Sequence, residues 1–167
     1  DLVIDAAANP DISRWLALGP TPARQLMAVA ATWGAWGGTI LRLPATGGGC
    51  WACAELGRDD RTVAWPPASP EAAVADGCSA PTFPGAAHDL ADLANHAVRV
   101  AAAQLCGTGD AWADLHILTH RRDDGTVTVP TWRTAALTVH PDCRRIHPNA
   151  ATTTPGPAPS DDAPARN

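Results

Sequence analysis

The residues best suited to chemistry in this chain are its cysteines, and their spacing indicates metal binding and a separate thiol. Cys50 and Cys53 form a Cys-x-x-Cys pair, Cys78 lies in a stretch rich in proline and glycine, and Cys143 stands near the end of the sequence. Zinc takes four tetrahedral nitrogen or sulfur ligands, and a Cys-x-x-Cys pair supplies two of them. The sequence therefore predicts a zinc half-site at Cys50 and Cys53 and an exposed thiol elsewhere.

Composition and charge exclude several classes of partner. The number of cysteines, five, is odd, which favours metal and thiol chemistry in a reducing, cytoplasmic compartment over a disulfide framework. All twelve basic residues are arginine, the net charge is −5, and no basic stripe is visible. We therefore expect no nucleic-acid partner. No apolar run is long enough to cross a bilayer, so no membrane partner is expected either.

The elements that must position these cysteines follow a pattern typical of an α/β sheet. Asn9 and Pro10 predict the start of a helix, because asparagine caps and proline is tolerated in the first turn. Apolar residues at helical spacing predict a second, core-packed helix that ends before Gly107. The expected strands are 2–4, 25–31, 37–43, a hairpin formed by 113–119 and 126–129, and 134–140; the expected second helix is 90–105.

Two further segments are predicted from composition. Residues 57–77 are rich in charged residues and proline and are expected to form a long surface loop. One domain is expected over residues 1–148, followed by a disordered tail or linker at 149–167, which is rich in threonine, proline and alanine. The chain opens on Asp1 without a methionine, so we interpret it as a fragment of a longer protein.

This order of elements and cysteines resembles the C-terminal half of the ThiF/MoeB family, adenylyltransferases related to ubiquitin-activating enzymes. The features that carry the resemblance are the Gly37-Gly38 strand, Cys50-x-x-Cys53, the Cys78 loop, the long helix, the hairpin and the terminal Cys143. They cover about residues 1–147. The resemblance implies part of a Rossmann-like sheet with a zinc knuckle and a terminal antiparallel hairpin. It also implies a homodimer.

The resemblance implies a second Cys-x-x-Cys near the C-terminus as the other half of the zinc site. Here Ile146 stands where the last ligand should be, and His147 follows it. Because histidine is an accepted zinc ligand, Cys50, Cys53, Cys143 and His147 are the predicted set, with His140 a weaker candidate. The alternative is that the metal has been lost and that Cys50 and Cys53 are buried small hydrophobic residues, as is expected of Cys106.

Two other sites are implied by the same resemblance. Some family members form a thioester or persulfide at a cysteine in the position of Cys78, and a thiol near a helix N-terminus has a lowered pKa; the alternative is a structural cysteine. The family signature Asp-x-x-Asp-Asn helps to hold magnesium at ATP. Asp5 and Asn9 match it and are the candidate cofactor-binding residues, but Ala8 replaces the magnesium aspartate.

The function implied is ATP-dependent activation of the C-terminal carboxylate of a small ubiquitin-like or sulfur-carrier protein. The glycine-rich phosphate loop, the ribose-binding acid and the arginine and lysine that contact ATP belong to the family's N-terminal half, and no Gly-x-Gly-x-x-Gly follows a strand here. ATP and magnesium are therefore expected only together with that half. The rival hypothesis is a non-catalytic, zinc-stabilised binding or dimerisation subunit of the same fold. Ala8 and the altered ligand pair favour this rival.

Overall fold

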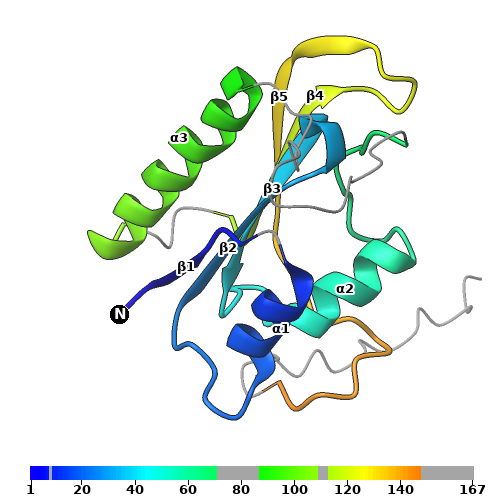
Figure 1. The fold of residues 1–167 in the computed structure, drawn as a ribbon. Helices are drawn as coiled ribbons and strands as arrows, with labels where there is room; N and C mark the ends of the chain where they lie inside the picture. Colours follow the sequence, from blue (N-terminus) through cyan, green and yellow to red (C-terminus); the bar gives the residue numbers. More distant parts are fainter. Residues whose placement is uncertain (8, 71–86, 109–112, 148–167) are drawn as a thin grey trace, which may run out of the picture.

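A computed structural model describes residues 1–7, 9–70, 87–108 and 113–147. Its centre is a mixed five-stranded sheet in the order β1-β2-β3-β4-β5. Helices α1 and α2 cover one face, here called the front, and α3 covers the other, the back (Figure 1). The elements are β1 Val3–Asp5, α1 Pro10–Leu18, β2 Leu26–Ala31, the 3-10 turn η1 Trp33–Ala35, β3 Gly37–Leu43, α2 Trp51–Asp59, α3 Ala87–Leu105, β4 Leu115–Arg121 and β5 Val127–Ala135.

The strand pairing combines one parallel step with an antiparallel meander. β1 pairs with β2 in parallel, with Val3 opposite Leu26, and α1 forms the crossover between them. β2, β3, β4 and β5 then pair antiparallel in sequence, with Leu41 opposite Leu115. The structure is thus a mixed α/β fold, and the predicted α/β class and terminal hairpin are confirmed.

Helix α1 begins where the sequence predicted. The Asn9 side-chain oxygen accepts hydrogen bonds from the backbone N–H groups of Asp11 at 2.9 Å and Ile12 at 3.4 Å, and Pro10 occupies the first turn. These bonds satisfy donors that a helix start leaves without intrahelical partners. The same capping places Asn9 at the carboxyl end of β1.

Alternation along β2 and β3 divides the core between the two faces. Leu26, Ala28 and Leu41 belong to the front cluster, whereas Met27 and Ile40 belong to the back cluster. Side chains on a strand alternate between faces, and both faces are covered here, so β2 reads as a continuous apolar run. β3 is buried along its whole length but also contains Thr39 and Arg42. Buried residues of α3 complete the back cluster, namely Leu93, Ala97, Val100 and Ala101.

Three sequence predictions need correction. β1 was expected to be buried, but Val3 and Ile4 are 36% and 52% exposed, because β1 lies at the edge of the described sheet. The strand expected at 134–140 is wrong: β5 continues to Ala135, and beyond it only Thr138 forms an isolated bridge, to Gly48. The loop expected from 57 begins later, because α2 continues to Asp59.

Two predicted segments lie wholly or partly outside the described residues. They are residues 71–77 of that loop and residues 148–167, which include the predicted tail.

The histidines of β4, His116 and His120, are buried and hydrogen-bonded. His116 is 2% exposed, contacts His96 of α3 through ring nitrogens 3.0 Å apart, and reaches the Ala113 carbonyl at 3.1 Å. His96 in turn stacks on Trp132 of β5 with ring centroids 4.0 Å apart. The pair therefore connects α3 to the β4–β5 hairpin.

We predict that His116 makes the fold sensitive to acid. Burial foremost, together with His96, lowers the pKa of His116 to about 4. In the unfolded chain the histidine has an ordinary pKa of about 6.5 and binds the proton more readily. The contribution of neutral His116 to the free energy of unfolding is therefore fully present above that pH and decreases as pH drops from there towards 4. Urea unfolding at several pH values should show a loss of up to about 3 kcal/mol from this group. His116→Gln should flatten that part of the profile, and an unchanged profile in the variant would contradict the assignment.

Candidate metal centre and adjoining cleft

Four side chains from distant parts of the chain converge at the N-terminal end of α2. The Sγ atoms of Cys50, Cys53 and Cys143 and the Nε2 atom of His147 all lie within 4.8 Å of one another. The Cys50 sulfur lies 3.7 Å from that of Cys53 and 3.8 Å from that of Cys143. The His147 nitrogen lies 4.0, 3.6 and 3.3 Å from the sulfurs of Cys50, Cys53 and Cys143. These four residues can hold a metal ion, and they are the set that the sequence predicted.

The spacing of these atoms fits a tetrahedral metal. With metal–sulfur bonds of about 2.3 Å and metal–nitrogen bonds of about 2.0–2.1 Å, a tetrahedron places two sulfurs about 3.8 Å apart and a sulfur and a nitrogen about 3.6 Å apart. The two sulfur–sulfur distances match the first value, and the three sulfur–nitrogen distances scatter around the second. Three thiolates and one imidazole are donors typical of zinc.

Local structure explains why two of the ligands share one element. Cys50 is the N-cap of α2, and Cys53 is buried in the first turn of that helix. The Cys-x-x-Cys pair therefore lies at the start of a helix, which the sequence analysis did not predict. The positive end of a helix dipole favours the thiolate form that a metal requires.

A backbone carbonyl orients the histidine ligand. The His147 Nδ1 atom lies 3.0 Å from the Gly48 carbonyl oxygen, which accepts its hydrogen bond. The tautomer that donates from Nδ1 presents the lone pair of Nε2 to the three sulfurs. Gly48 has φ +81°, a conformation that side chains other than glycine rarely adopt, which explains part of the glycine run at 47–49.

The two cysteines of α2 differ in acidity. Burial raises the pKa of the Cys50 thiol to about 11; a hydrogen bond from the Cys53 backbone acts to lower it, and the Cys53 side chain acts to raise it. Burial also acts to raise the pKa of Cys53, but hydrogen bonds from the backbone N–H groups of Cys50 and His140 outweigh it and lower that pKa. Crowded thiols of this kind lose their protons on binding a cation, so metal affinity rises with pH.

A buried carboxylate that the sequence interpretation missed joins the two halves of the centre. Asp114, 1% exposed, accepts hydrogen bonds from the Thr46 N–H at 2.7 Å, the Thr46 hydroxyl at 2.8 Å and the Gly47 N–H at 3.1 Å. It also accepts one from the Leu137 N–H at 2.9 Å. Thr46 and Gly47 lead into Cys50, and Leu137 leads towards Cys143. Asp114 is an isolated residue in the sequence, so no local pattern marks it.

His140, the weaker candidate ligand, has a different partner. Its Nε2 atom lies 2.8 Å from the Asp60 carboxylate, which stands at the C-cap of α2. Thr62 foremost, and then His140, lower the pKa of Asp60 to about 2. The segment that carries Cys143 and His147 therefore contacts α2 at both of its ends.

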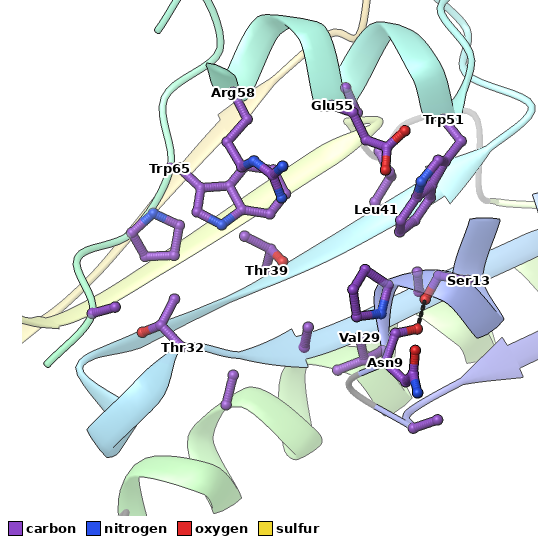
Figure 2. A pocket seen from close by; sticks show the side chains of 18 of the residues that line it. Asn9, Ser13, Val29, Thr32, Thr39, Leu41, Trp51, Glu55, Arg58 and Trp65 are labelled. Atoms are coloured by element: carbon purple, nitrogen blue, oxygen red, sulfur yellow. Dashed lines mark hydrogen bonds between the residues drawn. The ribbon is translucent and has the colours of Figure 1, made fainter. Parts of the chain in front are cut away.

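A cleft of about 650 Å³ lies beside the metal centre on the front face. Ala28, Ala30, Thr39 and Leu41 of β2 and β3 are among the residues of its floor. Figure 2 shows Trp51, Glu55 and Arg58 descending from α2 on one side, with Asn9 and Ser13 opposite and Trp65 at the far end.

Most of the charged groups around the cleft are paired. Arg14 of α1 bonds to Glu55 of α2 at 2.7 Å, and the Arg58 guanidinium lies 5.8 Å from the centroid of the Trp65 ring. Arg58 also pairs with the adjacent Asp59 at 3.0 Å. The cleft therefore offers largely apolar and aromatic walls with a few polar groups, which is typical of a ligand site.

The remaining predicted site residues lie in or beside the β1–α1 turn. The Asp5 carboxylate accepts hydrogen bonds from the Ala7 N–H at 3.0 Å and from the Ser13 hydroxyl. Asn9 caps α1 and lines the cleft. Both residues thus have structural partners at the carboxyl end of β1. Cys78 and Ala8 lie outside the described residues.

Comparisons with known proteins leave the family open. No protein-family model matches the chain. The chain is 28% identical over 149 residues to the uncharacterized protein y4oA of Sinorhizobium fredii (strain NBRC 101917 / NGR234). That match covers 86% of this chain and 25% of the relative, so the chain spans about a quarter of the relative's length. In the part of the chain that is described, no helix has the length and apolar character needed to cross a membrane.

We predict that Asp114→Asn destabilises the fold and weakens metal binding together. In the wild type the carboxylate accepts hydrogen bonds from backbone N–H groups, whereas the asparagine side chain would place its own NH₂ donor against some of them. The free energy of unfolding should therefore fall by about 3 kcal/mol. Burial acts to raise the pKa of Asp114, but bonds from Leu137, Thr46 and Gly47 lower it. The difference in free energy of unfolding between the wild type and Asp114→Asn should therefore be fully present above about pH 4 and be lost as pH falls further.

Urea unfolding and metal titration, repeated on the exposed Asp123→Asn as a control, measure both effects. Equal stability of the two variants would show that Asp114 does not join the two segments.

Proposed function

We propose that the metal held by Cys50, Cys53, Cys143 and His147 is a structural zinc ion. Four protein ligands complete a tetrahedral shell and leave no position for a substrate, as in structural zinc sites. Bound there, the ion would supply a cross-link between the start of α2 and the C-terminal segment, and no reaction step would pass through it.

We further propose that the chain is part of an ATP-dependent adenylyltransferase. It would act on the C-terminal carboxylate of a small ubiquitin-like or sulfur-carrier protein. The observation that carries this proposal is the place of the cleft: Ala7 and Asn9 follow the end of β1, Ala31 and Thr32 lie at the end of β2, and all four line it. In open α/β sheets, ligands bind at the carboxyl ends of the parallel strands. The cleft's apolar walls suit an extended protein tail.

In the proposed reaction, a carboxylate oxygen of the tail attacks the α-phosphorus of ATP, and pyrophosphate leaves. The cleft residues described here would hold and orient the tail and exclude water from it. The resemblance to ThiF/MoeB enzymes assigns ATP and magnesium to a preceding half, with Asp5 and Asn9 at the boundary, and implies a homodimer. Cys78 is the proposed thiol that would accept the activated carrier.

The second candidate is a zinc-stabilised binding or dimerisation subunit without ATP chemistry. Ala8 lacks the oxygen ligand that magnesium requires. Asp5 and Asn9 already accept hydrogen bonds within the β1–α1 turn. A protein that only binds a carrier would need the cleft and the metal centre but not a magnesium site.

We predict about one zinc ion per chain in protein purified without chelator, since four ligands converge at tetrahedral spacing. Elemental analysis gives the number directly. The double variant Cys50→Ser, Cys53→Ser should lose the metal, whereas Cys106→Ser should retain it. Cys106, which was wrongly expected to be buried, is exposed at the end of α3 and lies outside the cluster. Zinc retained in the double variant would refute the site.

We predict that the full-length protein catalyses carrier-dependent exchange of pyrophosphate into ATP. Ala8→Asp should raise the magnesium-dependent rate, because it returns an oxygen ligand. Cys78→Ala is the matched control: it should leave exchange intact, because adenylation precedes thiol attack. If the full-length protein binds a carrier but shows no exchange, even with Ala8→Asp, the binding subunit is the better assignment.

A further inference from the structure

Trp51 contains a buried donor without a partner. Among the described residues, its ring nitrogen Nε1 is the one buried side-chain nitrogen or oxygen that makes no hydrogen bond. A buried polar group left unpaired costs about 1–3 kcal/mol. The ring packs against the front core and lines the cleft (Figure 2). An unpaired donor at the wall of a cleft is explained if a ligand supplies the acceptor.

The backbone at Trp51 is held by the metal centre. Trp51 lies between the ligands Cys50 and Cys53 in the first turn of α2, and the far end of that helix is held by the Asp60–His140 pair. With zinc bound, the main chain at this position is fixed from both directions. The Trp51 ring can then adjust to a ligand only by rotation about its side-chain torsions.

The walls near Trp51 favour an extended peptide as the ligand. The floor of the cleft includes Ala28, Ala30, Thr39 and Leu41, and Ala54 lies on the same helix as Trp51. Small side chains leave room for a backbone to approach closely. An extended peptide presents a carbonyl oxygen about every 3.4 Å and ends in a carboxylate, so it offers acceptors throughout its length.

We propose that Trp51 is a specificity-determining residue of the cleft. Its indole N–H donates a hydrogen bond to a backbone carbonyl or terminal carboxylate oxygen of an extended peptide tail, and the metal centre holds it in position to do so. The inference rests on the proposed function, because that function supplies the tail. The ring nitrogen is covered when the cleft is empty, so the bond forms together with a small turn of the ring as the tail enters.

The test uses zinc-loaded full-length protein and N-acetyl-tetra-alanine with a free C-terminal carboxylate. In ¹⁵N-labelled protein, the indole N–H resonance of Trp51, assigned by its loss in Trp51→Phe, should move downfield as the peptide is added. Trp51→Phe should bind the peptide about tenfold more weakly, because it keeps an aromatic ring but removes the donor. Trp15→Phe is the matched control, since Trp15 is 60% exposed on α1 and outside the cleft, and should bind normally.

Each outcome decides the proposal. Binding with an unmoved Trp51 resonance, equal affinity in Trp51→Phe, or no binding of the peptide would overturn it. If Trp51→Phe does not fold, the wild-type resonance alone decides. Carrier-dependent exchange that persists in Trp51→Phe with unchanged KM would overturn this inference and leave the proposed function standing. Peptide binding that depends on Trp51 in a protein without exchange activity would support the inference and favour the binding subunit.

Discussion

The placement of both sites depends on the hydrogen bonds to one buried carboxylate, that of Asp114. A buried charge is tolerated only when donors surround it, and here four donors from two segments do so. Thr46 and Gly47 belong to the segment that enters α2, and Leu137 to the segment that ends at His147. Because neither segment can leave without exposing unpaired N–H groups or an unpaired carboxylate, the two are held side by side before any metal binds.

Close backbone contact completes that junction. The Gly49 N–H donates to the Leu137 carbonyl at 2.9 Å, and Gly48 bridges to Thr138. A Cβ atom at Gly47 or Gly49 would come within 2.6 Å of atoms of Leu137. The glycine run before Cys50 is therefore a packing requirement as well as a turn. It also brings the Gly48 carbonyl to His147. The orientation of that ligand therefore depends on the absence of side chains at the three positions before Cys50.

The sequence was most informative where local chemistry decides structure. The cap at Asn9 and the apolar spacing of α3 predicted α1 and α3, whereas α2 was not predicted. The cysteine spacing predicted the half-site at Cys50 and Cys53, and the resemblance to ThiF/MoeB enzymes added Cys143 and His147. The sequence was misleading where distant contacts decide. Gly57 indicated a loop, but it lies inside α2 and is buried there. A Cβ at this position would come within 2.4 Å of the Val63 side chain, so packing against a residue after the helix explains the glycine. Asp114 was missed because its partners are 23 to 68 residues away and leave no local pattern.

The properties of α2 explain why a metal centre belongs beside this cleft. A helix of nine residues is marginal by itself, and the buried residues of α2 are small: Cys53, Ala54 and Gly57. They bury little apolar area, and the Arg14–Glu55 pair adds little because its arginine is 57% exposed. Apart from the Trp51 ring, which packs against the front core, hydrophobic contacts therefore fix this helix weakly. Ligands at its N-terminus and the His140 contact at its C-cap supply the missing constraints, and the same helix carries Trp51, Glu55 and Arg58 into the cleft. The geometry of the cleft is thus determined largely by contacts outside it.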